Sequence, residues 1–173
     1  MKSRLLFSNS ASDSVDLSFI IPTYKRSVFL ADAIQSILAQ PHLPGLSVEI
    51  VIVNNDPNDK MEELIRLYKD ANIRISFYSN DKNYGQVGNI NQGITLSNGK
   101  YVAILHDDDM LNSNYLESLK PIIQSDRKYD CVVVSQYLLF EKYRHDFKHL
   151  LLNLLFLFRF LYRKKLTLIK PSF

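Results

Sequence analysis

Short apolar runs alternate with segments of helical periodicity along most of the chain. Runs of strand length, bounded by polar residues, predict strands at residues 17–21, 48–53, 73–78, 101–105 and 131–137. The run at 73–78 alternates between apolar and polar positions, so this strand is expected to be less buried. Helices are predicted between the strands, where apolar residues recur at helical spacing around Leu30, Leu64 and Ile90, and also over 113–125.

Local signals set the expected ends of these helices. Ser27 suits the N-cap of the first helix, and Pro41 is expected to end that helix after Gln40. The pair Asn98-Gly99 predicts a left-handed C-cap for the third helix. Pro121 predicts a bend in the helix over 113–125, because proline removes a backbone hydrogen bond.

Strands that alternate with helices at this spacing predict crossover units. The expected architecture is therefore a mainly parallel sheet with helices on both faces, a three-layer α/β/α fold. In such sheets, ligands bind beyond the carboxyl ends of the strands. Three polar clusters follow predicted strands, at residues 22–26, 54–59 and 106–109. We expect them to lie together at one edge and to form the site.

Length and charge divide the chain. Its 173 residues fit one domain with a substantial core. The polar residues 1–16 are expected to be a flexible N-terminus. Residues 17–139 are expected to form the domain. Residues 1–139 are mildly acidic, with 13 Lys and Arg against 16 Asp and Glu. Residues 140–173 hold 8 against 2, which indicates a separate, basic and apolar helical tail.

The tail suggests a membrane surface. Its apolar stretch from Leu150 to Tyr162 has 13 residues, too few to span a bilayer. A leucine-rich and aromatic helix flanked by basic residues is typical of the interface, so 148–165 is expected to contact a membrane peripherally. A core helix is the alternative. Nucleic-acid binding is not favoured, since the basic residues border an apolar helix.

The N-terminus carries no secretory signal, and the single cysteine, Cys131, lies inside an apolar run. We therefore expect a buried thiol in a reducing compartment. The predicted location is the cytoplasm, at the inner face of the cytoplasmic membrane.

Three consecutive aspartates, Asp107, Asp108 and Asp109, follow the apolar run at 101–105. Like charges at a strand end become tolerable beside a divalent cation, and Mg²⁺ and Mn²⁺ prefer such oxygen ligands. An acidic start to a helix is the alternative. His106 is either a further ligand or a structural hydrogen-bonding group. No G-x-x-x-x-G-K or G-x-G-x-x-G pattern occurs, which argues against those ATP and dinucleotide sites.

Asn54 and Asn55 also allow two interpretations, as turn residues or as amides suited to a nucleobase edge.

Taken together, the motifs resemble the family-2 glycosyltransferases. The resemblance rests on F-I-I-P-T-Y-K-R, on I-V-I-V-N-N-D-P, and on the long segment from Asn83 to Leu111 that ends in H-D-D-D-M-L. It covers roughly residues 17–137. It implies the nucleotide-sugar-binding part of a GT-A fold, incomplete at its C-terminus.

By position, the resemblance implies nucleotide-binding roles for Pro22, Thr23, Tyr24, Arg26, Asn55, Asn83, Gly85, Asn91 and Asp107. Asn55 stands where the family usually has an aspartate that hydrogen-bonds the base, and Ile90 replaces a common arginine. Gly93 matches the end of the same motif. Asp108 is implied as the direct ligand of Mn²⁺ or Mg²⁺, with Asp107 and Asp109 in the same metal-binding region.

The implied activity is metal-dependent, inverting transfer of a sugar from a nucleotide-diphosphate sugar to an acceptor hydroxyl. The implied setting is cell-surface polysaccharide synthesis on a saccharide or lipid-linked acceptor. The general base of relatives has no counterpart here, since Glu141 and Asp146 come too early. We therefore expect a truncated member. A non-catalytic nucleotide-binding or interaction module is the alternative, and a nucleotidyltransferase is a more remote one.

Overall fold

The computed structural model describes residues 1–9 and 14–126. They belong to a first compact unit, Met1–Arg127, and a second unit comprises Lys128–Phe173. The predicted strand at 131–137, Cys131 and the tail at 140–173 lie outside the described residues. Within the described part, no helix has the length and apolar character needed to cross a membrane.

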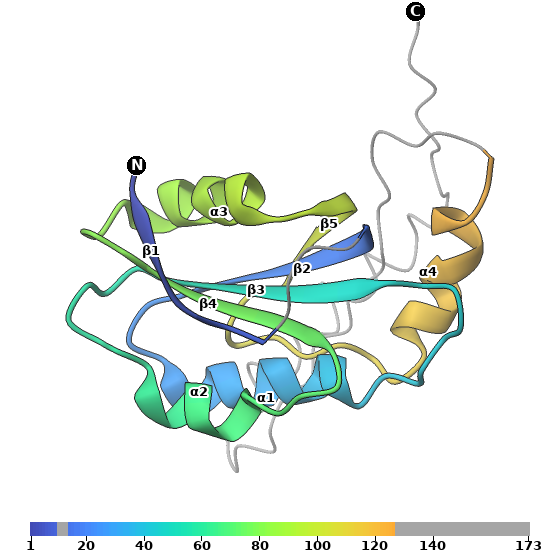
Figure 1. Ribbon diagram of the computed structural model, residues 1–173, viewed down its shortest axis with the longest axis horizontal. Helices are drawn as coiled ribbons and strands as arrows, with labels where there is room; N and C mark the ends of the chain where they lie inside the picture. The colour runs from blue at the N-terminus through green and yellow to red at the C-terminus, as the bar shows by residue number, and fades with distance from the viewer. Residues whose placement is uncertain (10–13, 127–173) are drawn as a thin grey trace, which may run out of the picture. The chain divides into compact units, whose positions relative to one another are not determined.

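Five strands form one sheet in the order β1-β4-β3-β2-β5 (Figure 1). Strand β2 pairs in parallel with β3 on one side and with β5 on the other, and β4 continues the parallel pairing beside β3. Only β1, among the described strands, is antiparallel, and it pairs with β4. The predicted mainly parallel sheet is confirmed; its strands are β1 (Ser3–Ser8), β2 (Val15–Thr23), β3 (Val48–Asn54), β4 (Arg74–Asn80) and β5 (Gly99–Ile104).

Helices cover both faces of this sheet. In Figure 1, α3 lies on one face, whereas α1 and α2 lie on the other. The main apolar core forms between the sheet and the α1–α2 layer, where Phe19, Ile52 and Phe77 are fully buried against Leu30 and Ile34. The three-layer arrangement is therefore as expected; its helices are α1 (Ser27–Leu38), α2 (Glu62–Tyr68), α3 (Gly85–Leu96) and α4 (Tyr115–Ile123).

The expectation of a flexible segment over residues 1–16 is wrong for Ser3–Ser8, which form β1. The Ser3 hydroxyl donates to Asn80 Oδ1 at 2.6 Å, and the Ser76 hydroxyl donates to Ser8 Oγ at 2.9 Å. A short, half-exposed edge strand carries too few buried apolar residues to be distinguished from coil by its pattern. Strand β2 also starts at Val15, two residues before the predicted position.

Two predicted helix caps are also wrong. Arg26, not Ser27, holds the N-cap position of α1, and no side chain caps that end; α1 ends at Leu38 rather than after Gln40. Helix α3 ends in an extended Ser97, and Gly99 begins β5. A Cβ at Gly99 would lie 2.6 Å from the Ser18 backbone nitrogen, so close strand approach, and not a left-handed cap, requires this glycine.

Helix α3 packs closely against β2 at Gly93. A Cβ at this position would lie only 2.3 Å from Ile20 Cγ2 and 3.5 Å from Val53 Cγ2. A larger residue would have to push the helix away from the sheet. Gly93, which matches the end of the motif that begins at Asn83, therefore sets the distance between α3 and the strands that carry the site.

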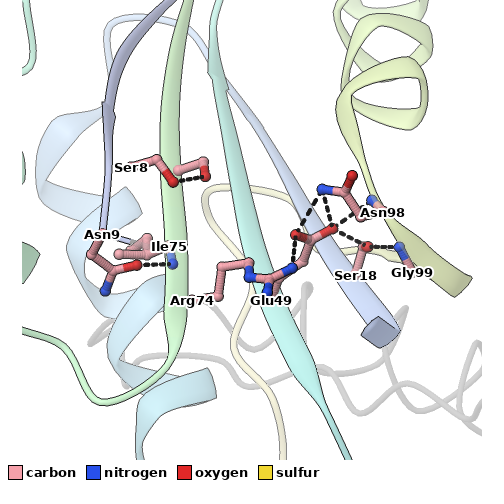
Figure 2. A network of polar contacts seen from close by, with 9 residues as sticks. Ser8, Asn9, Ser18, Glu49, Arg74, Ile75, Asn98 and Gly99 are labelled. Atoms are coloured by element: carbon pink, nitrogen blue, oxygen red, sulfur yellow. Dashed lines mark hydrogen bonds and ion pairs between the residues drawn. The ribbon is translucent and has the colours of Figure 1, made fainter. Parts of the chain in front are cut away.

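At the amino ends of the strands, a buried carboxylate connects neighbouring elements (Figure 2). Glu49 is 1% exposed, and its Oε1 accepts from the Ser18 hydroxyl and from the Asn98 backbone N–H, both at 2.6 Å. Its Oε2 accepts from Asn98 Nδ2 at 3.1 Å and lies 3.8 Å from Arg74 Nη1. One side chain thus holds β2, β4 and the α3–β5 turn to β3.

Replacing Glu49 tests this role. Glu49→Gln keeps the size of the side chain but removes its charge and turns an N–H₂ group toward donors that need an acceptor. We expect the free energy of unfolding to fall by about 1–3 kcal/mol, measured by urea denaturation. Lys100→Ala is the control, because Lys100 pairs with Asp16 at an exposed position, and its denaturation midpoint should change much less.

Candidate functional site

The loops after β2, β3 and β5 meet at the carboxyl edge of the sheet, as predicted. The Asn55 backbone N–H donates to the Thr23 carbonyl at 2.9 Å, which joins the ends of β2 and β3. The Thr23 hydroxyl donates to Asp107 Oδ2 at 2.8 Å, which joins β2 to the loop after β5. Thr23 and Asp107 are both buried. Parallel pairing in register therefore brings the three polar clusters together.

The three aspartates have different surroundings. The Asp107 side chain is 9% exposed, and the Asp108 side chain is 50% exposed. Arg26 Nη1 lies 2.6 Å from Asp108 Oδ2 and 3.5 Å from Asp107 Oδ1. Asp109 is exposed, and its backbone N–H donates to the His106 carbonyl at 3.1 Å in a turn. Asp107 and Asp108 therefore share one guanidinium, and Asp109 makes no recorded side-chain contact with it.

Arg26 as the counter-ion of the aspartates was not predicted from the sequence. Lys25 has φ 57°, so the backbone turns between two adjacent basic residues. The Lys25 ammonium lies 4.0 Å from Asp56 Oδ2 and 5.2 Å from the centre of the Tyr24 ring, whereas Arg26 points to Asp107 and Asp108. The available signal was a basic pair directly after a strand, on the same edge as the aspartates.

A network of asparagines lies at the same edge of the sheet as Asp107 and Asp108. Asn55 Nδ2 donates to Asn83 Oδ1 at 2.8 Å and to the Gly85 carbonyl at 3.2 Å. Asn55 Oδ1 accepts from Asn80 Nδ2 and from the Tyr84 backbone N–H, each at 2.9 Å. Both hydrogens and both lone pairs of the buried Asn55 amide are thus bonded within the protein. In this arrangement, Asn55 shapes the loop over residues 80–85.

Asn89 completes the network, although its role was not predicted. It is 3% exposed, accepts from Asn80 Nδ2 at 2.9 Å, and donates to the Val53 carbonyl at 3.0 Å. Asn91, the residue implied by the resemblance, is exposed on α3. The buried residues of α3 are Asn89, Gln92 and Gly93, which recur at helical spacing. Polar residues on the buried face of a helix were the signal for Asn89.

The remaining predicted residues surround this network. Pro22 is buried in β2 opposite Val53, and Tyr24 is 43% exposed. Gly85 has φ +71°, and its N–H donates to Asn83 Oδ1 at 2.8 Å, so a glycine suits this left-handed position.

The same loop also contacts the N-terminal segment. The Lys2 N–H donates to Tyr84 Oη at 2.9 Å, and the Tyr84 hydroxyl donates to Asp81. Its hydrogen bond to the Asp81 carboxylate raises the pKa of Tyr84. The loop at 80–85 is therefore held by the first residues of the chain as well as by Asn55.

The carboxylate oxygens of the aspartates suit a hard divalent cation that needs few protein ligands. Within residues 1–9 and 14–126, no group of three or more His, Cys, Asp or Glu side chains could hold a metal. Asp107 and Asp108 provide two carboxylates within reach of a single positive group. Mg²⁺ and Mn²⁺ commonly take one or two protein ligands and complete their shells with water and phosphate oxygens. The pair fits such a cation, and the exposed Asp109 stays a predicted member of the same metal-binding region.

An open groove of about 620 Å³ lies next to this edge. Its lining comes from the start of α1 and from the segment between β3 and α2, including Val28, Asp59 and Leu67. Neither Asp107 nor Asp108 lines it. The groove is therefore a neighbouring surface and not the space in front of the aspartates.

Comparison with known proteins identifies related sequences. A family model described as Glycosyl transferase family 2 matches residues 18–172, beyond the expected limit near 137. The GalNAc(5)-diNAcBac-PP-undecaprenol beta-1,3-glucosyltransferase of Campylobacter jejuni is 34% identical over 105 residues, which are 60% of this chain and 33% of that protein. The chain spans less than half of the length of the first curated relatives that it matches.

Solved structures share the fold. TarS from S. aureus, residues 1–349 in complex with UDP-GlcNAc, has a TM-score of 0.56 at 21% identity, covering 63% of this chain and 31% of that one. The mannosyltransferase PcManGT from Pyrobaculum calidifontis, in complex with GDP-Man and Mn²⁺, has a TM-score of 0.55 at 15% identity, covering 66% and 34%. The predicted GT-A fold is confirmed by this likeness.

The asparagine network predicts that an amide is required at position 55. Asn55→Asp would place a carboxylate oxygen against Asn83 Oδ1 and the Gly85 carbonyl, so two hydrogen bonds would become repulsive contacts. We expect a loss of about 1–3 kcal/mol in the free energy of unfolding and faster amide hydrogen exchange over residues 80–85. Asn58→Asp, the same chemical change at an exposed position, is the control. Equal effects of the two substitutions would contradict the role of Asn55.

Proposed function

Because the chain belongs to glycosyl transferase family 2, we propose that it binds a nucleotide-diphosphate sugar and takes part in inverting transfer of the sugar to an acceptor hydroxyl. The observation that carries this proposal is the pairing of Asp107 and Asp108 around Arg26 at the carboxyl edge of the parallel sheet. This edge is where ligands bind in open α/β sheets. Oriented carboxylates and a guanidinium there can hold a diphosphate and its cation.

Each residue of the site has a defined task in this proposal. Asp107 is buried and oriented by the Thr23 hydroxyl, so it provides a fixed carboxylate. Asp108 is half-exposed and supplies the accessible ligand for Mn²⁺ or Mg²⁺. When bound, such a cation would offset charge on the departing diphosphate. No residue described by the structure is assigned as the general base.

The proposed donor and acceptor follow from the names of related proteins, and the proposed membrane contact follows from the sequence of this chain. TarS was solved with UDP-GlcNAc, and PcManGT with GDP-Man and Mn²⁺, which supports a nucleotide-sugar donor with a divalent cation. The name of the Campylobacter relative specifies an undecaprenol-linked acceptor, which supports a saccharide or lipid-linked acceptor in cell-surface polysaccharide synthesis. The basic, apolar segment 148–165 supports peripheral contact with the inner face of the cytoplasmic membrane.

Donor binding is tested by thermal unfolding. With Mn²⁺ and UDP or GDP at roughly a hundredfold excess over the Kd, the melting temperature should rise by about 5 °C or more. Asp108→Asn should abolish the rise, because it removes the accessible ligand. Asp109→Asn should keep it, because Asp109 lies outside the pair. Absence of any rise with either nucleotide would contradict the proposal.

Sugar transfer needs a separate assay. The chain is incubated with labelled UDP- and GDP-sugars and an extract of lipid-linked saccharides, and labelled product is measured. Donor binding without transfer to any acceptor would favour a non-catalytic binding module.

The hydrogen bond from Thr23 to Asp107 predicts a further effect on donor binding. Thr23→Val keeps the shape of the side chain but leaves Asp107 Oδ2 without its donor. We expect the Kd for UDP with Mn²⁺ to rise about tenfold, measured by isothermal titration calorimetry. Thr95→Val is the matched control, since the Thr95 hydroxyl donates to the Asn91 carbonyl on the exposed side of α3, and its Kd should stay unchanged.

A further inference from the structure

We propose that Arg26 couples cation binding to diphosphate binding, by neutralising Asp107 and Asp108 until a divalent cation replaces it and by then binding the diphosphate. This inference rests on the proposed function, because it concerns the same cation and donor. It assigns Arg26 two successive partners, the carboxylates and the phosphates.

The geometry places Arg26 where it competes with a cation. Its Nη1 is 2.6 Å from Asp108 Oδ2 and 3.5 Å from Asp107 Oδ1. Among the described residues, it is the only basic side chain recorded in an ion pair with either aspartate. A divalent cation bound by the same two carboxylates would lie within a few ångströms of the guanidinium, and like charges at that distance repel each other.

The surroundings of Arg26 allow its guanidinium to move away from Asp107 and Asp108. Its side chain is 51% exposed, and an exposed ion pair is weak, so exchange of partners costs little. Arg26 holds the N-cap position of α1 without a side-chain hydrogen bond to the helix. The guanidinium can therefore move without loss of a helix cap, and its shortest contact, to Asp108, is the exposed one.

Phosphate oxygens provide its second partner. A guanidinium displaced from the carboxylates would lose its acceptors, and a diphosphate bound beside Asp107 and Asp108 offers new ones in a geometry that arginine fits well. Lys25 is directed to another partner, since its ammonium lies toward Asp56, whereas Arg26 already lies at the two aspartates.

The consequence is positive coupling between the two ligands. Without a diphosphate, a cation has to displace Arg26 and leave it beside a like charge, so the free cation binds weakly. With a diphosphate, the displaced guanidinium is neutralised again. Each ligand should then raise the affinity of the other by the same factor.

The test is a titration with Mn²⁺, followed by electron paramagnetic resonance of the free ion, with and without UDP or GDP. Wild type is compared with Arg26→Gln and with Lys25→Gln, which removes the same charge from the neighbouring residue. We expect Arg26→Gln to bind Mn²⁺ alone about two- to fivefold more tightly than wild type. Its gain in Mn²⁺ affinity on adding nucleotide should be smaller than that of wild type. Lys25→Gln should behave like wild type.

The outcomes separate the two proposals. Unchanged or weaker binding of Mn²⁺ alone by Arg26→Gln would overturn the role of Arg26, and so would an equal gain of affinity in Lys25→Gln. Failure of wild type to bind Mn²⁺ with either nucleotide would instead overturn the proposed function. The melting temperature of Arg26→Gln is the control for folding. A value within about two degrees of wild type, as expected for a surface substitution, verifies that the fold is kept.

Discussion

The carboxylates of Asp107 and Asp108, in the loop after β5, repel each other unless a positive charge lies close to both. Parallel pairing of β2 with β3 and β5 creates this situation, because it directs three polar loops to one edge. Arg26 meets the requirement from the loop after β2, and the Thr23 hydroxyl fixes the buried member of the pair. The site is therefore a consequence of strand direction first and of particular side chains second.

At the opposite end of the sheet, a carboxylate is stabilised in another way. Glu49 is buried with its charge, and it is surrounded by donors from Ser18, Asn98 and Arg74. The Glu49 side chain is only 1% exposed, so this carboxylate is closed to a ligand and holds elements together. Near Asp108 the carboxylate is half-exposed and has a replaceable partner. The same chemical group thus serves structure at one edge and suits binding at the other, according to its burial.

Periodicity predicted the strands, the parallel sheet and the meeting of the polar clusters, because buried runs such as I-V-I-V leave few alternatives. It failed for β1, where edge residues are half-exposed. The cap signals failed at Ser27, because Arg26 holds the N-cap position, and at Gly99, where close approach to β2 requires the glycine. Within the site, the motifs indicated Asp107, Asp108 and Asp109. They did not indicate that Arg26 neutralises both or that Asn89 lies in the buried network, because both facts depend on side-chain direction in the folded chain.

Strand β1 has a further consequence for the behaviour of the protein in solution. It covers the edge of β4, and β4 would otherwise present a row of unpaired backbone groups. Proteolytic loss of the first eight residues would open that edge to pairing with a second molecule. The short segment that was expected to be a flexible N-terminus therefore replaces the β4 edge with a shorter strand whose register shifts between Leu5 and Phe7, and such an edge is less suited to pairing with another chain.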